Sequence, residues 1–171
     1  MTTNVETNQG ADLEADERIE CQSSEPFANW LAQLNGSLAV TTYQAGKVAL
    51  LGWRDRRMSL LMRQFTKPMG LAVGPGKLAL ATRHEITLFA DATLLARDVL
   101  VDQPGRYDAL YLPRVTYHTG DVNVHDVAFG SDGLWFVNSR FSCLSALSKD
   151  FSFVSRWKPS FVSEVDRKSV V

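Results

Sequence analysis

The stretch GLWFVNSRFSCLSAL, Gly133 to Leu147, alternates large apolar residues with small or polar ones, passes through a short polar turn and alternates again. Two similar lines lie upstream: GKLALATRHEITLF, which begins at Gly76, and GSLAVTTYQAGKVALL, which begins at Gly36. Apolar residues at i and i+2 define one face of a β-strand. Each line therefore predicts two antiparallel strands joined by a turn.

The three lines form a repeat. Leu38, Leu78 and Leu134 occupy the same place in each line; the first two are 40 residues apart and the last two 56. An interval of 40 residues is close to the roughly 40–50 residues of one propeller blade. The longer second interval predicts an insertion in the third unit.

Further apolar stretches complete each unit. MGLAV (69–73) and HDVAF (125–129) precede the second and third lines, and the fourth strands are expected at MSLLMRQF (58–65), LLARDVLV (94–101) and FSFVSRW (151–157). The first unit lacks an inner strand. Four antiparallel strands per unit predict an all-β protein, a β-propeller fragment of about three blades. The alternative is an ordinary antiparallel sandwich.

Both ends of the chain differ from this pattern. Residues 1–25 carry seven acidic residues and one basic residue, which predicts a disordered acidic tail. Residues 26–165 form the partial propeller, and PFANWLAQL, with Phe27 and Leu31 at helical spacing, predicts a short N-terminal helix. Residues 166–171, DRKSVV, match the translation of a common sequencing adapter, so we expect them to be non-native.

Composition narrows the class of protein. With 45% hydrophobic and 22% charged residues, the chain is expected to be globular. No signal peptide and no long apolar run occur, and Cys21 and Cys143 have no paired spacing, so we expect a cytoplasmic protein without membrane association. Basic residues gather at 54–67, but the ordered part is only weakly basic, so nucleic-acid binding is not expected.

Several phrases, among them SLAVTTYQAGKVALLGW, GRYDALYLPRVTYHTGD and GLWFVNSRFSCLSALS, resemble an uncharacterised bacterial family of conserved hypothetical proteins. The resemblance spans Phe27 to Phe161. It implies a propeller-like fold, attachment to tetratricopeptide repeats in some members, and a continuation beyond this chain, which would then be a truncated N-terminal half. It names no catalytic residue and no cofactor.

The first candidate site lies in the insertion, where His118, Asp121, His125 and Asp126 fall within nine positions. In a propeller, residues that open an inner strand face the central channel, and the equivalent Met69-Gly70 is expected to leave space opposite. Imidazole and carboxylate groups converging there could hold a metal or an anionic ligand. The alternative is that His125 and Asp126 only bond the loop backbone.

The second candidate site is formed by the polar turns after each second strand, which contain Arg83, Asn138 and Arg140. Turns of neighbouring blades lie side by side, so the two arginines could receive a carboxylate or phosphate. The alternative is a solvated rim. Together the sites predict a binding module for a small ligand or a partner protein at the channel mouth. A metal-assisted hydrolase or lactonase-like enzyme is the second hypothesis.

Overall fold

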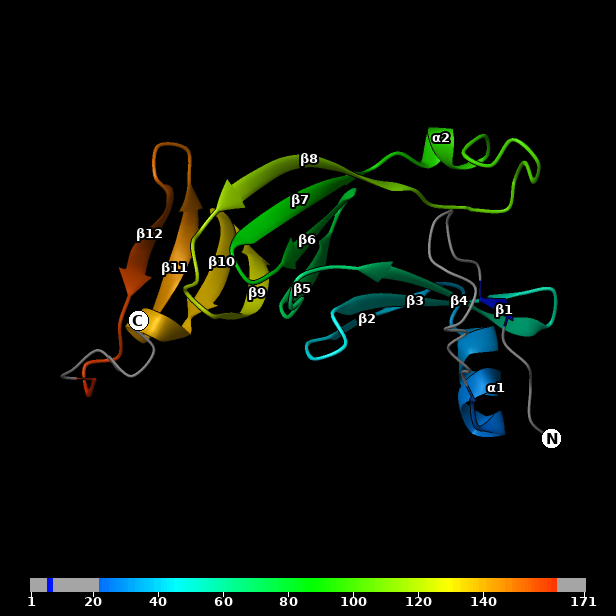
Figure 1. Ribbon diagram of the computed structural model, residues 1–171, viewed down its shortest axis with the longest axis horizontal. Coiled ribbons are helices and arrows are strands. Elements are labelled where there is room, and N and C mark those ends of the chain that lie inside the picture. Colours follow the sequence, from blue (N-terminus) through cyan, green and yellow to red (C-terminus); the bar gives the residue numbers. More distant parts are fainter. Residues whose placement is uncertain (1–5, 8–21, 163–171) are drawn as a thin grey trace. The chain divides into compact units, whose positions relative to one another are not determined.

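The computed structural model describes residues 6–7 and 22–162, so residues 166–171 and most of the predicted acidic tail lie outside the described residues. The chain divides into two compact units, residues 1–67 and 68–171, which are described separately. The protein is mainly β, with three four-stranded sheets and one nine-residue helix (Figure 1). No helix in the described ranges has the length and apolarity needed to cross a membrane.

The first unit combines one sheet with the predicted helix. The sheet has the order β1-β4-β3-β2, in which β1 pairs with β4 in parallel and the other pairs are antiparallel. Its elements are β1 (Glu6–Thr7), α1 (Glu25–Gln33), β2 (Leu38–Thr42), β3 (Lys47–Arg54) and β4 (Arg57–Gln64). Asp55 and Arg56, between β3 and β4, both have positive φ, as a two-residue hairpin turn requires.

Helix α1 covers part of one face of this sheet. It begins where the Ser24 side chain accepts a hydrogen bond from the Phe27 main-chain nitrogen at 3.4 Å, a normal N-cap. Its Leu31 is buried, and the helix contacts β3 and β4, where Met58 and Leu60 are also buried. The helix predicted from the apolar spacing is therefore confirmed.

The second unit holds two antiparallel sheets whose strands follow one another in sequence order (Figure 1). One contains β5 (Leu71–Gly74), β6 (Lys77–Ala81), β7 (Glu85–Asp91) and β8 (Tyr111–His118). The other contains β9 (Val124–Gly130), β10 (Gly133–Asn138), β11 (Cys143–Ser148) and β12 (Ser152–Trp157). The short helices α2 (Thr93–Ala96) and η1 (Ser139–Phe141) lie between strands.

One predicted strand is wrong. LLARDVLV (94–101) forms α2 and turns, and β8, inside the predicted insertion, is the fourth strand of its sheet. Leu94 and Val101 are 92% and 89% exposed, so this segment gains little burial. The main-chain nitrogen of Ala92 donates to the Leu110 oxygen at 2.7 Å, which closes the loop at its base. The extra residues therefore lie before the fourth strand.

Each sheet of the second unit contains one of the strand pairs that the sequence repeat predicts. Ala79 pairs with Leu88 in the β6–β7 pair, and Trp135 pairs with Ala146 in the β10–β11 pair. The sheets enclose one apolar core, formed by Ala79, Ala81, Ile86, Val122, Val124, Val127, Leu134 and Phe136. Both strand pairs that the sequence repeat predicts here are thus present as antiparallel pairs.

The first strands of these sheets, β5 and β9, lie against each other. A Cβ atom at Gly70 would be 2.9 Å from the carbonyl carbon of Asp126, and one at Gly74 would be 3.0 Å from the Phe129 ring. The order of these contacts shows that β5 and β9 run in the same direction. The last strands of the two sheets, β8 and β12, contact each other less than β5 and β9 do. The two sheets therefore spread apart with distance from β5 and β9 (Figure 1).

Candidate functional site

A connector, residues 119–123, leads from β8 to β9 and joins two polar turns. On one side, the main-chain nitrogens of Thr119 and Gly120 donate to the His84 oxygen at 2.8 and 3.2 Å, in the turn between β6 and β7. On the other side, the main-chain nitrogen of Arg140, in the turn between β10 and β11, donates to the main-chain oxygen of Val122 at 3.2 Å. The connector therefore fixes the two turns beside each other.

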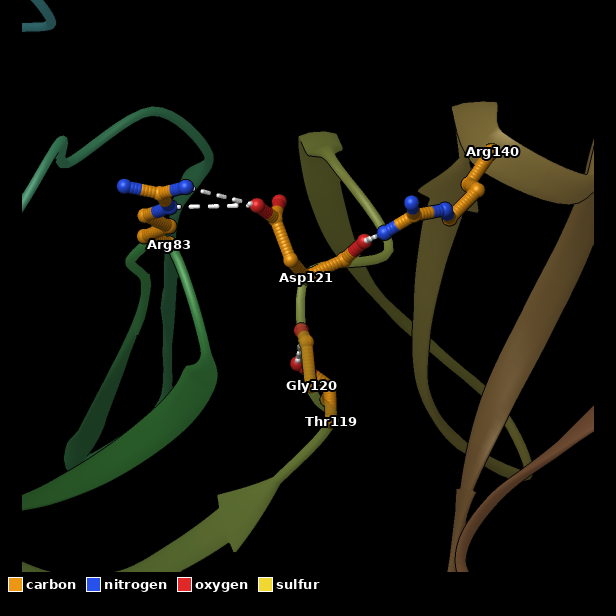
Figure 2. A network of polar contacts seen from close by, with 5 residues as sticks. All are labelled: Arg83, Thr119, Gly120, Asp121 and Arg140. Carbon is orange, nitrogen blue, oxygen red and sulfur yellow. Dashed lines mark hydrogen bonds and ion pairs between the residues drawn. The ribbon is translucent and has the colours of Figure 1, made fainter. Parts of the chain in front are cut away.

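Asp121 is the centre of this arrangement (Figure 2). Both Nε and Nη2 of Arg83 lie 3.1 Å from Oδ2 of Asp121. From the opposite side, Nη1 of Arg140 donates to the main-chain oxygen of Asp121. Arg83 and Arg140 thus meet at the same residue, and the carboxylate bound by Arg83 belongs to the protein itself.

This cluster, which we call the arginine rim (Arg83, Asp121 and Arg140), stays accessible to solvent. The side chains of Arg83 and Asp121 are 43% and 39% exposed. Among the described residues, no partner contacts Oδ1 of Asp121, Nη1 of Arg83, or Nε and Nη2 of Arg140. The rim therefore presents donors of both guanidinium groups and one carboxylate oxygen to solvent.

His118, His125 and Asp126 do not form a common cluster with Asp121. Nε2 of His125 lies 3.0 Å from Nδ2 of Asn123, and Oδ1 of Asp126 accepts from the Val127 nitrogen at 2.9 Å. His118 is exposed at the end of β8, paired with Glu85. Nowhere in residues 6–7 and 22–162 do three His, Cys, Asp or Glu side chains come together as a metal site.

The space expected opposite His125 and Asp126 does not exist. Gly70 is buried, and the main chain of Asp126 and Val127 occupies the place where its side chain would be. Gly70, the residue directly before β5, allows this close approach, so main chain fills the predicted gap. The side chains of His125 and Asp126 are exposed instead.

Asn138 lies in the interior. It is fully buried, its Oδ1 accepts from the Phe141 nitrogen at 3.2 Å, and its Nδ2 donates to Oγ of Ser145 at 3.4 Å. The first of these bonds caps η1. The apolar alternation of the sequence already indicated that Asn138 is buried, because Asn138 follows Leu134 and Phe136 on the inward face of β10.

An open pocket of about 350 Å³ lies behind the turn between β10 and β11. Its lining is Val137, Asn138, Ser139, Ser142, Cys143, Leu144, Trp157 and Pro159, none of them charged. Cys143 is a buried free thiol whose Sγ lies 3.5 Å from Oγ of Ser155. Sequence reasoning did not find this pocket, because its walls come from β10, β11 and the residues around the end of β12.

These features define an all-β protein of four-stranded sheets that carries a polar, arginine-containing rim. The chain belongs to the family described as Domain of unknown function (DUF4915), which matches residues 25–169. An uncharacterised family is what the sequence resemblance predicted. No curated protein and no solved structure matches the chain.

Proposed function

We propose that this chain is part of a β-propeller that serves as a binding module, and that it binds a small anionic ligand at the arginine rim. The anion is a carboxylate or a phosphate, since guanidinium groups bind both through charge-assisted hydrogen bonds. A protein partner would bind the same place through an acidic side chain. Arg83, Asp121 and Arg140 carry the binding.

Three features support the propeller arrangement. Each sheet of the second unit has four antiparallel strands in sequence order. Their first strands lie together and run in the same direction, as strands around a propeller channel do. The sheets then spread apart toward β8 and β12, as wedge-shaped blades require. A propeller further predicts that other sheets continue this arrangement.

The single observation that supports anion binding is the set of unused polar atoms on the rim. Arg83 binds Asp121 through one edge of its guanidinium group, and Arg140 uses only Nη1. The connector and its main-chain hydrogen bonds hold both turns in place without the ligand. A site whose residues are already positioned loses less conformational entropy on binding.

Calorimetric titration of the 171-residue chain with inorganic phosphate and with citrate tests this proposal. Arg140→Gln removes one charged hydrogen bond to the ligand, worth about 1.5–3 kcal/mol, so affinity should fall roughly 10- to 100-fold. Arg114→Gln, at an exposed position on β8, is the matched control and should leave affinity unchanged. Equal losses in both variants, or no binding to the parent chain, would contradict the proposal.

A metal-assisted hydrolase or lactonase-like enzyme is the second hypothesis from the sequence. No observation in the described part of the chain favours it, because no three potential metal ligands converge there. A cytoplasmic location stays a prediction. The attachment of related chains to tetratricopeptide repeats stays a prediction as well.

A further inference from the structure

One complete edge of the Arg140 guanidinium group has no protein partner. Its Nη1 donates to the main-chain oxygen of Asp121, while Nε and Nη2 have no partner among the residues that the structure describes. These two nitrogens share one edge of the planar group, so their N–H bonds point in the same direction and can bind one carboxylate together. Arg83 uses this same edge to bind the Asp121 carboxylate, with both nitrogens 3.1 Å from Oδ2. The pair of Arg83 and Asp121 therefore shows which group the free edge of Arg140 can bind.

Arg140 is held in place without a ligand. It lies in η1, where Oδ1 of Asn138 accepts a hydrogen bond from the Phe141 main-chain nitrogen at 3.2 Å. The main-chain nitrogen of Arg140 donates to the Val122 oxygen, and its side chain is bonded to Asp121 through Nη1. The residue is half-buried. A carboxylate that binds the free edge therefore meets a guanidinium group whose conformational entropy is already reduced.

Asp121 brings a carboxylate to the same place. The main-chain nitrogen of Val122 donates to the Gly120 oxygen at 2.9 Å, so Asp121 is the central residue of a three-residue turn. Val122 is buried and anchors this turn. Figure 2 shows the Asp121 carboxylate between the two guanidinium groups of the arginine rim. Oδ2 binds Arg83, and Oδ1, which has no partner in the described ranges, is the acceptor that remains for a ligand.

The charges of the rim favour one kind of anion. Two guanidinium groups and one carboxylate give the arginine rim one net positive charge. A single ligand carboxylate balances this charge, whereas a phosphate dianion exceeds it. Any anion at Arg140 also lies near the negative charge of Asp121, and like charges repel. An ammonium group on the ligand turns this repulsion into an attraction, because it donates a charge-assisted hydrogen bond to Oδ1 of Asp121.

We propose that the ligand of the arginine rim is a small amino acid. Its carboxylate binds Nε and Nη2 of Arg140, and its ammonium group binds Oδ1 of Asp121. Arg83 keeps the Asp121 carboxylate in position through Oδ2. Amino-acid binding rests on the proposed function, because it uses the same anion site and names its ligand class. The rim then recognises a pair of opposite charges rather than an anion alone.

Matched pairs of ligands test the role of the ammonium group. Glycine, β-alanine and γ-aminobutyrate differ from acetate, propionate and butyrate only by that group, and the three lengths vary its distance from the carboxylate. NMR titration of the 171-residue chain near neutral pH and at fixed ionic strength, followed at the amides of Gly120, Asp121 and Arg140, gives the dissociation constants. We expect at least one amino acid to bind roughly three- to tenfold more tightly than its matched carboxylate, the effect of one charge-assisted hydrogen bond at a partly exposed site.

The same titrations separate the ligand class from anion binding itself. If the amino acid and the plain carboxylate bind equally in every pair, the ligand class is wrong, while the rim remains an anion site. If neither these ligands nor phosphate bind, the proposed function is wrong as well. The matched pairs need no variant, so the parent chain alone decides between these results.

Asp121→Asn removes the negative charge and should abolish the preference for the amino acid. The plain carboxylate should bind this variant more tightly than it binds the parent, because the repulsion is lost. A purely structural role of Asp121 would not shift the two kinds of ligand in opposite directions. Asp150→Asn removes the same charge at an exposed position in the turn between β11 and β12, and it should keep the preference of the parent. A folded Asp121→Asn chain that still prefers the amino acid would overturn the proposal.

Discussion

Gly70 lies against the main chain of Asp126, so closely that a Cβ atom on Gly70 would be 2.9 Å from the Asp126 carbonyl carbon. No ordinary contact between side chain and backbone is that short, so the two strands must separate if any other residue stands at position 70. This contact joins the first strands of two sheets. The absence of a side chain at Gly70, directly before β5, therefore lets the two sheets approach this closely.

Gly70→Ala should destabilise the second unit by about 1–3 kcal/mol, the usual cost of adding a methyl group to a close-packed site. The neighbouring atoms are main chain and cannot rotate away. Hydrogen exchange of the β5 and β9 amides would measure the loss. Gly36→Ala is the control, since its nearest atom would be 3.8 Å away, and it should change stability by less than about 0.5 kcal/mol. A Gly70→Ala protein as stable as the control would contradict the close contact.

The ion pair between Arg83 and Asp121 should be weak. Both side chains are about two-fifths exposed, so water screens the attraction. A double-mutant cycle with Arg83→Gln and Asp121→Asn should give a coupling energy of about 0.2–1 kcal/mol. Raising the salt concentration should reduce it further. A coupling well above this range that salt leaves unchanged would show a buried pair, contrary to the structure.

Phe136 should be among the most costly residues to truncate. It is 2% exposed and packs edge-to-face against Phe153, with ring centroids 5.4 Å apart. Phe136→Ala should cost about 3–5 kcal/mol in denaturant unfolding. Trp53→Ala, at a half-buried position in the first unit, should cost less. Equal losses at the two positions would place the main core elsewhere.

Strand pairing was predictable from the sequence because the apolar alternation is local. The pairs β2–β3, β6–β7 and β10–β11, and helix α1, are where their patterns place them. The fourth strand β8 was missed, since LLARDVLV is apolar enough for a strand but remains exposed. The pairing of Arg83 with Asp121, 38 residues further on, depends on how two turns approach, which no local pattern specifies.

Asn138 and Arg140 provide the last test, because the sequence placed both in the ligand site and the structure separates them. Asn138→Ala removes the acceptor for the Phe141 nitrogen and the donor to Ser145, both in the interior. Unfolding free energy should therefore fall by about 1–3 kcal/mol. Phosphate affinity of the folded protein should stay the same.

Arg140→Gln should show the opposite behaviour, with weaker phosphate binding and a smaller loss of stability, since Arg140 is only half-buried. Ser139→Ala, next to Asn138 but half-buried and with its hydroxyl unbonded within the described residues, is the control and should change neither quantity appreciably. Thermal unfolding and calorimetric titration of the three variants give both readouts. If Asn138→Ala lost phosphate binding but kept its stability, Asn138 would be a ligand-binding residue. Its buried hydrogen bonds to Phe141 and Ser145 would then be wrong.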